Sequence, residues 1–169
     1  MTMKRWAMGA AAALLAAGSA QAQLAGDSSA PIDITADEAE VINSQCLAIW
    51  RGGAEALQAG TRMRANVIRV YSAKKGDGCG STERLEAEGA VYYVTEGRAM
   101  RADNAVYASG SETVTLTGGV ILVEGQNVAR GDRLVVNVDT GAAQMTSNAR
   151  GRGNPNRVRG VFYPSGGSQ

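Results

Sequence analysis

Residues 102–136 read ADNAVYASGSETVTLTGGVILVEGQNVARGDRLVV, and the landmarks of this stretch also occur 66 residues earlier in the chain. Ala102-Asp103 corresponds to Ala36-Asp37, and Gly118-Gly119 corresponds to Gly52-Gly53. The other matches at this offset are Arg130-Gly131-Asp132 with Arg64-Ala65-Asn66, Leu134 with Ile68, and Val136 with Val70. Places that share one offset without a gap indicate an internal repeat. Units of this kind stack edge to edge and bury together the apolar surface that one unit leaves exposed.

A partial third copy, Gly89-Ala90-Val91 followed by Arg101-Ala102-Asp103, lies between the other two. Each unit consists of a Gly, a short apolar strand, a polar turn, and a small-residue/Asp pair that opens another apolar strand. Glycines at such intervals are typical of turns and sharp bends. The repeat therefore predicts an extended β scaffold, a shape suited to binding something along its length.

Apolar and polar residues alternate within the units. In Thr113 to Glu124 the even positions include Val114, Leu116, Val120 and Leu122. A period of two indicates strands with one apolar face, which is typical of an antiparallel sheet. The three prolines of the chain lie at the margins of the repeat, so ladder hydrogen bonds can run through it without interruption. We predict an all-β fold of about ten to twelve short strands.

Two segments need a separate interpretation. Asp37 to Arg51 is the nearest candidate for a helix, but Asn43-Ser44 interrupts it like a hairpin turn, so we predict strand, turn and strand. Residues 149–156 are rich in Gly, Arg and Asn and predict a mobile loop. Arg157 to Phe162 regains strand character before Pro164 ends it, and its alternating arginines would protect a last strand against random aggregation.

The first residues have the order of a secretory signal peptide. Lys4 and Arg5 precede an apolar run from Trp6 to Ala17, and Ala20-Gln21-Ala22 supplies a small-residue cleavage site. The run is too short for a bilayer span of roughly 20 residues, and an uncleaved membrane anchor is the alternative. Cleavage removes two cations and no acids, so the formal charge changes from +1 to −1. A nearly neutral body gives no electrostatic case for binding nucleic acid.

Export would place the protein in an oxidising compartment, so Cys46 and Cys79 are candidates for a disulfide. Both lie at predicted turns. The bond would close a loop of about 33 residues and stabilise the fold by roughly 3–4 kcal/mol in the loop-entropy estimate. Two free thiols are the alternative, because the sequence does not fix the distance between the Cα atoms.

The chain lacks the residues for most kinds of active site. It contains no histidine, which removes the usual general base and the commonest metal ligand. Its two cysteines cannot complete a four-ligand zinc site, and it has no Gly-rich phosphate loop or Gly-x-Ser-x-Gly turn. Glu86, Glu88 and Glu96 are carboxylates of the kind that form acid/base pairs, but Glu86 and Glu88 share the solvent face of one strand. We expect a binding protein without enzymatic activity, cofactor or metal.

The apolar face has two possible uses. It can close onto another sheet as a dry sandwich core, or the sheets can stay partly open and line a groove for an apolar ligand. Aromatic residues make up only 5% of the chain, so few large side chains are available to fill a wide core. The composition mildly favours the groove and leaves both uses open.

The string NVARGDRL at 127–134, followed by Ala143-Gln144-Met145 and Arg157-Val158-Arg159, resembles the OstA-like family of lipopolysaccharide-transport proteins. The opening PIDITAD at 31–37 resembles the first strand of that family's mature domain, and the Gly-x-Val and Ala-Asp units match its internal repeat. The resemblance covers about Pro31 to Pro164. It implies an open, twisted antiparallel β-jellyroll that shelters lipid A acyl chains, while sugar and phosphate face outward. The cysteines and the Gly76–Gly80 loop are not part of the family pattern.

On this resemblance the protein is a periplasmic bridge that carries lipopolysaccharide from the inner-membrane to the outer-membrane part of the transport machinery. The implied partners are lipopolysaccharide, inner-membrane LptC-like and outer-membrane LptD-like proteins joined by β-strand augmentation, and further copies joined head to tail. One alternative is a structural β-scaffold adaptor that binds only proteins through its strand edges. Another is a membrane-anchored LptC-like relative. The expected parts are a cleaved signal peptide (1–22), a flexible segment (23–30), the OstA-like domain (31–164) and a disordered tail (165–169).

The alternation predicts which side chains face the interior and line a lipid-binding groove. These are Ile32, Ile34, Ile68, Val70, Leu85, Val91, Tyr93, Tyr107, Val114, Leu116, Val120, Leu122, Leu134, Val136 and Val138. Tyr107 is a looser choice, because Val106 competes for the inward position. The arginines at 150, 152, 157 and 159 either meet lipid phosphates at the rim or form a solvated tail and protect the edge strand, which is the more usual role of a charge cluster.

Overall fold

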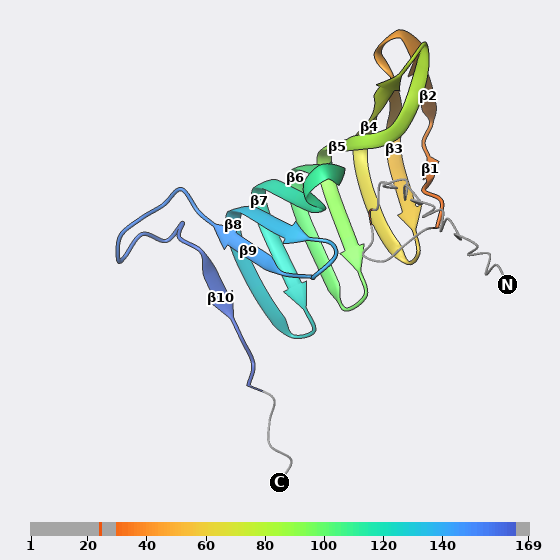
Figure 1. Cartoon of the computed structure of the whole chain (residues 1–169). Coiled ribbons are helices and arrows are strands. Elements are labelled where there is room, and N and C mark those ends of the chain that lie inside the picture. Colours follow the sequence, from red (N-terminus) through yellow and green to blue (C-terminus); the bar gives the residue numbers. More distant parts are fainter. Residues whose placement is uncertain (1–23, 25–29, 165–169) are drawn as a thin grey trace, which may run out of the picture.

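The computed structural model describes Leu24 and residues 30–164, and the described chain is built almost entirely of β-strands. Its ten strands form one antiparallel sheet (Figure 1), which confirms the all-β, open antiparallel fold class. The strands are β1 (Asp33–Thr35), β2 (Glu38–Ile42), β3 (Leu47–Gln58), β4 (Thr61–Lys75), β5 (Gly78–Thr95), β6 (Arg98–Ala108), β7 (Thr113–Glu124), β8 (Asn127–Asn137), β9 (Ala143–Thr146) and β10 (Arg159–Val161). Two short 3-10 helices, η1 (Asn43–Gln45) and η2 (Ser109–Ser111), follow β2 and β6. The predicted signal peptide and tail lie outside the described residues.

Strands β3 to β8 lie side by side in chain order, each antiparallel to the next. The two edges depart from this pattern, because each edge strand is in two pieces. At one edge β1 and β2 both pair with β3, and at the other β9 and β10 both pair with β8. Each piece covers a different half of its neighbour.

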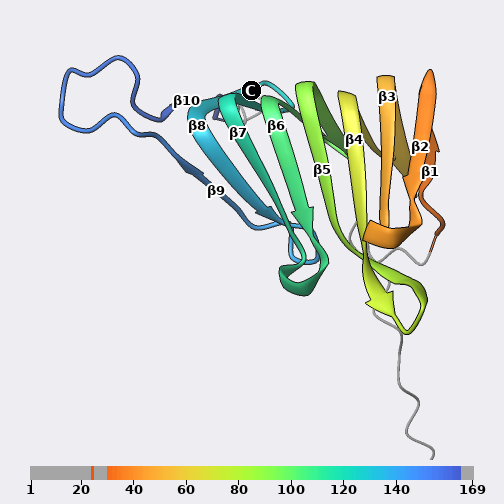
Figure 2. The same cartoon turned by 90° about the horizontal axis from the view of Figure 1, so that it is seen from above.

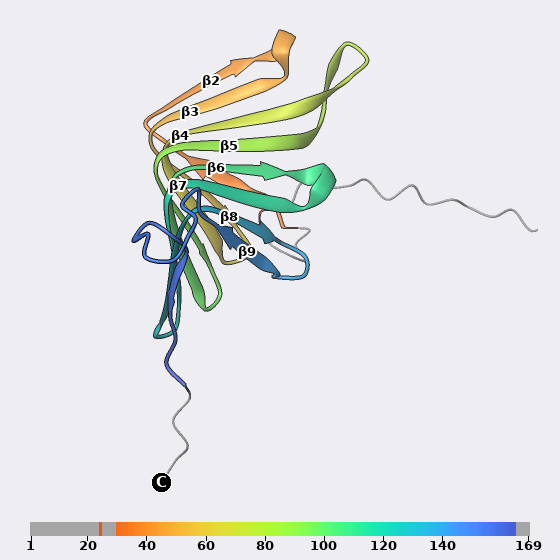
Figure 3. The ribbon, with the colours of Figure 1, turned by 90° about the vertical axis from the view of Figure 1, so that its left-hand side faces the viewer.

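The strands from β3 to β8 bend sharply, so that the sheet folds into two arms (Figure 3). The bend coincides with a register shift between neighbours, as between Arg51 and Ala54 of β3 or Thr117 and Val120 of β7. At this place β3, β5 and β7 each carry two consecutive residues with positive φ, namely Gly52-Gly53, Gly89-Ala90 and Gly118-Gly119. Glycine adopts positive φ without strain, and an extra residue in one strand of a pair bends that strand.

The first glycine of each bulge lies under a polar side chain from the preceding segment. A Cβ atom on Gly52 would lie 2.3 Å from Oδ2 of Asp37, and one on Gly118 would lie 2.4 Å from Oδ2 of Asp103. Asn66 takes the same place against Gly89, where a Cβ atom would lie 2.5 Å from its Nδ2. The Gly and Asp positions of the repeat therefore belong together, because the Asp or Asn side chain packs against the Gly backbone in each copy.

These bulges correct the expected strand lengths. We predict short strands, but the three bulges lie inside β3, β5 and β7, which have 12, 18 and 12 residues. A bulge bends a strand while its ladder continues on both sides. The bulges of β3 and β7 are 66 residues apart, so this offset spans two hairpins. The bulge of β5 lies between them and corresponds to the partial third copy of the repeat.

Asp37 to Arg51 forms strand, turn and strand as predicted, through β2, η1 and β3. A disulfide joins Cys46, at the end of η1, to Cys79, near the start of β5, with a Cα–Cα distance of 5.4 Å. Between Tyr71 and Leu85 the chain forms one hairpin, with its turn at Gly76-Asp77. The disulfide ties this hairpin to the N-terminal edge.

The two arms are named after the edge strands that they contain. The β2–β9 arm comprises residues 38–51, 67–88, 104–117 and 133–146, and the β1–β10 arm comprises 33–35, 54–65, 91–102, 120–131 and 159–161. Apolar side chains of both arms belong to one buried cluster. The link between β9 and β10, residues 147–158, projects from the sheet as a long loop (Figure 2).

Candidate functional site

The inward face of each arm carries rows of apolar side chains that run from strand to strand. In the β2–β9 arm, one row consists of Val70, Leu85, Tyr107, Val114 and Val136, each paired in the ladder with the next. A second row consists of Ile68, Ala87, Ala105, Leu116, Leu134 and Met145. Cross-strand partners have Cβ atoms about 4.5–5.5 Å apart, so each row is a continuous apolar surface.

The β1–β10 arm faces these rows with its own side chains. Its main row consists of Met63, Tyr93, Met100, Leu122 and Ala129. Beside the bend, where the two arms meet, lie Ala65, Val91, Ala102 and Val120. Small and β-branched side chains therefore fill the narrow end of the interior, and larger ones fill the wider end.

All fifteen predicted groove residues belong to this interior cluster or pack against it. Ten are buried members of the cluster: Ile68, Leu85, Val91, Tyr93, Tyr107, Val114, Leu116, Val120, Leu134 and Val136. The other five are partly buried and pack against it: Ile32, Ile34, Val70, Leu122 and Val138. All fifteen side chains therefore face the interior, as the alternation predicts. The role of these residues in binding lipid stays a prediction.

The interior cluster also contains buried residues that the alternation did not predict. Buried members that were not predicted are Leu24, Ala54, Ala56, Met63, Ala65, Ala87, Met100, Ala102 and Ala105. The signal was present for Ala87 and Ala105, which lie two positions from Leu85 and Tyr107. In β4 and β6 the inward positions change parity at the bend, so alternation from Ile68 or Tyr107 does not lead to Met63 or Met100. Leu24 had no such signal, because it lies outside the repeat.

The two arms close on each other along the centre of the interior. Ile68, Val91 and Leu116 are 0% exposed, so this part is a dry core, the first of the two uses of the apolar face. Open space lies at the mouth, where a cavity of about 870 Å³ is lined by residues from the tips of both arms. Tyr93, Met100, Val136 and Val138 connect this cavity to the interior rows.

One arginine bridges the mouth between the two arms. Arg98 begins β6 in the β1–β10 arm, and its Nη1 donates a hydrogen bond of 2.8 Å to the carbonyl of Gly141, in the turn after β8. Its Nε also forms an ion pair of 2.8 Å with Glu124 of the adjacent strand β7. The ion pair with Glu124 orients the guanidinium within its own arm, and the hydrogen bond to Gly141 restrains the other arm.

Elsewhere at the mouth, Leu24 is buried at 1% exposure and is held by hydrogen bonds. The hydroxyl of Tyr93 donates to its carbonyl at 2.9 Å, and its backbone N–H donates to the side-chain oxygen of Gln58. Burial, with a smaller contribution from Tyr107, raises the pKa of Tyr93 to about 12. The hydroxyl therefore stays protonated and able to donate at physiological pH.

An Arg98→Ala variant tests the bridge across the mouth. A single hydrogen bond contributes about 1 kcal/mol net, so the mouth should open roughly fivefold more often. We expect a matching increase in the rate at which the purified protein takes up an apolar fluorescent dye. Arg101→Ala, on the outer face of the same strand, is the control and should leave that rate unchanged. Equal rates for both variants and the wild type would show that the bond does not restrain the arms.

A family model described as LptA/(LptD N-terminal domain) LPS transport protein matches residues 33–142, from β1 to the turn after β8. The chain belongs to this family.

An uncharacterized protein of Rhizobium meliloti (strain 1021) is 31% identical over 120 residues, which are 68% of this chain and 64% of that protein. The chain therefore spans less than two thirds of that relative. A solved structure is also similar, with a TM-score of 0.69 and 19% sequence identity over 82% of this chain and 99% of that chain. It is LptH, the LptA homologous periplasmic component of the conserved lipopolysaccharide transport device from Pseudomonas aeruginosa. This likeness shows that the two proteins share a fold.

The match to the LptA/LptD N-terminal family leaves out part of the C-terminal edge. Strands β9 and β10 and the 147–158 loop lie beyond the matched residues. In the part of the chain that the structure describes, no helix is long and apolar enough to span a membrane.

Proposed function

We propose that this member of the LptA/LptD N-terminal family is a periplasmic lipid-binding bridge. It carries lipopolysaccharide from the inner-membrane to the outer-membrane part of the transport machinery, with the acyl chains between the two arms. The observation that carries this proposal is the apolar interior, whose rows continue from strand to strand between β3 and β8.

The energetics of such binding need no catalytic group. An acyl chain gains roughly 0.8 kcal/mol for each methylene that leaves water. A closed interior must first part its arms, and this cost is offset when several chains enter together. The 870 Å³ mouth supplies the entrance, since its lining already includes three residues of the interior rows, Tyr93, Met100 and Val136.

The topology supports end-to-end joining of copies and partners. Strands β9 and β10 run antiparallel to β8, whereas β1 and β2 run antiparallel to β3. Since β3 and β8 are themselves antiparallel through the intervening strands, β9–β10 of one copy and β1–β2 of the next would also be antiparallel. Head-to-tail β-augmentation would thus continue the sheet, and LptC-like and LptD-like partners would extend it at its two ends.

Site-specific photocrosslinking in cells that make lipopolysaccharide tests the proposal. The crosslinker is placed at Leu116 and Val136, which face inward, and at Arg133, whose ladder partner Thr117 lies beside Leu116 on the opposite face. We expect lipopolysaccharide adducts at the two inward positions and none at Arg133.

Adducts to protein alone at Leu116 and Val136, in a folded protein, would contradict lipid binding and favour the adaptor that binds only through its strand edges. Mass spectrometry of the mature amino terminus separates the bridge from a membrane-anchored relative. Cleavage after Ala22 is expected for a periplasmic bridge, and an intact first segment would indicate an anchor.

A further inference from the structure

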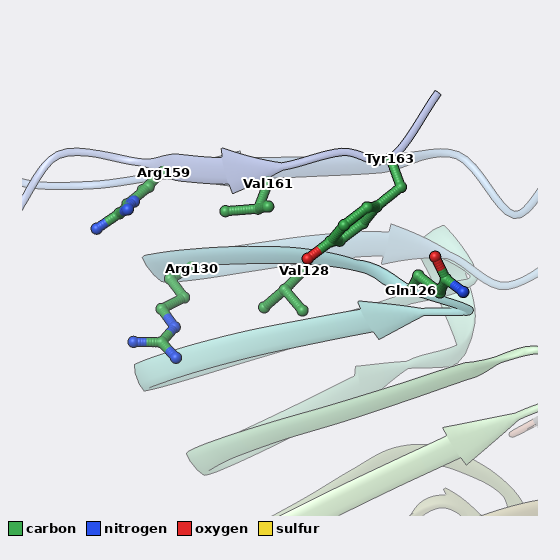
Figure 4. Close-up of a pocket in the computed structure, with 6 residues that line it drawn as sticks. All are labelled: Gln126, Val128, Arg130, Arg159, Val161 and Tyr163. Carbon is green, nitrogen blue, oxygen red and sulfur yellow. The ribbon is translucent and has the colours of Figure 1, made fainter. Parts of the chain in front are cut away.

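The C-terminal edge carries two arginines that face each other across neighbouring strands. Arg159 of β10 is the ladder partner of Arg130 of β8, and Figure 4 shows both beside Val128 and Val161, at one hollow. Within the described part of the chain, neither guanidinium forms an ion pair with a carboxylate. Like charges directly opposite each other destabilise a strand pair, so this pair lacks the anion that would stabilise it.

A third cation lies next to this pair. Arg157 lines, together with Arg130 and Arg159, a cavity of about 470 Å³ at the foot of the 147–158 loop. The nearby carboxylate of Asp132 is engaged elsewhere, because it accepts hydrogen bonds from the backbone N–H of Asn148 at 2.7 Å and the hydroxyl of Ser147 at 2.8 Å. These bonds lower the pKa of Asp132, and they fix the start of the loop at the bend.

The N-terminal edge carries the opposite charge. Asp33, Asp37, Glu38 and Glu40 are all exposed along β1, β2 and the link between them. Glu40 forms an ion pair of 2.9 Å with Arg51. Among the described residues the other three carboxylates have no ion pair with a cation. The two edges of one chain are therefore complementary in charge.

We propose that the N-terminal edge of a second copy supplies the missing anions and that these ion pairs lock the joint in one register, with Arg159 opposite Thr35. The inference rests on the head-to-tail joining proposed above and adds its register and its polarity. The register follows if the second copy continues the ladder rows of the sheet.

One outward row runs across the β1–β10 arm. It consists of Thr35, Glu55, Arg64, Tyr92, Arg101, Ile121, Arg130 and Arg159, each paired in the ladder with the next. If a second copy continues this row, its Thr35 follows Arg159. Antiparallel pairing then places Asp37 opposite Arg157 and Asp33 opposite Val161. The carboxylate of Asp33 lies on one diagonal of Arg159, about 7–8 Å away and within reach of a long side chain, whereas that of Asp37 stays against Gly52 of its own chain.

The same register matches the inward face. Gly160 is paired with Ala129 of an inward row, and Phe162, two positions on, has the same parity. Phe162 is 71% exposed in the single chain, and the register places it opposite Ile32 of the second copy. A slip by one residue would place an inward side chain of the second copy, Ile34 or Ala36, opposite the outward Arg159, so the apolar and charged faces select the same alignment.

The charges also set the direction of assembly. Two C-terminal edges would bring arginines together, and two N-terminal edges would bring carboxylates together. Repulsion of like charges disfavours both arrangements, whereas the head-to-tail joint is attractive. The head-to-tail direction of the assembly is then set by the charges at the two edges as well as by backbone pairing.

Charge reversal tests the lock. Arg159→Glu and Asp33→Arg are prepared as separate purified proteins, and self-association is measured by analytical ultracentrifugation. Each variant alone should associate at least tenfold more weakly than the wild type. An equimolar mixture should regain wild-type association, because every joint between unlike copies then has opposite charges. Arg101→Glu, in the same outward row but at the middle of the sheet, is the matched control and should associate like the wild type.

A wild type that stays monomeric, an Arg159→Glu variant that associates normally, or a mixture that does not recover would each overturn the lock. So would an Arg101→Glu variant that is weakened as much as Arg159→Glu. Binding of inorganic phosphate that Arg159→Glu abolishes, without any effect on association, would instead assign the arginines to a phosphate group. Lipid crosslinking at Leu116 in the same variants keeps the two proposals apart. Its retention in a protein with no joint would leave lipid binding standing and remove the lock alone.

Discussion

A Gly118→Ala variant is expected to lose about 2–5 kcal/mol of unfolding free energy. A residue other than glycine in a left-handed conformation costs about 1–2 kcal/mol, and Gly118 has φ +83°. The added Cβ atom would also lie 2.4 Å from Oδ2 of Asp103, and forced overpacking typically costs a further 1–3 kcal/mol. The measurement is urea denaturation, in which the midpoint should fall while the slope stays constant.

The adjacent glycine provides the matched control. Gly119 also has positive φ, at +52°, but a Cβ atom there meets nothing within 4 Å. Gly119→Ala should therefore cost only about 1 kcal/mol, the conformational part alone. The chain already contains this substitution, since Ala90 takes the second bulge position of β5 with φ +49°. Equal losses in the two variants would show that the contact with Asp103 does not require a glycine.

A Leu116→Asp variant is expected to lose more than about 5 kcal/mol, which is comparable to the whole stability of a typical domain. Removing a buried leucine side chain costs about 2–5 kcal/mol, and an unpaired carboxylate in its place adds a further desolvation penalty. Leu116 is 0% exposed, and its ladder partners Ala105 and Leu134 offer no hydrogen-bonding side chain. Circular dichroism should show loss of the cooperative unfolding transition.

Thr117→Asp is the control for this variant. Thr117 is the next residue along β7, and its ladder partner is Arg133 on the outer face. A carboxylate there stays in contact with water and lies opposite a cation, so the stability should change by less than about 1 kcal/mol. A folded Leu116→Asp protein with a normal transition would mean that the centre of the interior is wet in solution. The apolar face would then be an open groove even without lipid.

The inward residues could be predicted because strand parity is a local property. Leu116 and Val136 alternate with polar neighbours, and a period of two fixes the side of the sheet on which each lies. Parity also survives each bulge of β5 and β7, since Val91 and Val120 remain inward. The disulfide pairing was open to prediction for a different reason, because a chain with two cysteines permits only one internal bond.

The lengths of the strands and the contacts at the mouth could not be predicted in the same way. A Gly-Gly pair is compatible both with a turn and with a bulge, and only the packing of Asp103 against Gly118 distinguishes them. The bond from Arg98 to Gly141 joins turns of two different arms, and the burial of Leu24 depends on a segment outside the repeat. Such contacts form only after the two arms of the sheet have folded toward each other. They therefore produce no repeating pattern in the sequence from which they could be predicted.

The alternation of bulge-bearing and Asp- or Asn-bearing strands also has a consequence for evolution. A hairpin contains one strand of each kind, so the duplication or deletion of a whole hairpin leaves every Gly–Asp contact and both edges intact. The loss of a single strand would instead reverse the direction of one edge. Relatives of this protein should therefore differ in length by even numbers of strands. An engineered sheet that spans a longer distance would likewise be extended by whole hairpins.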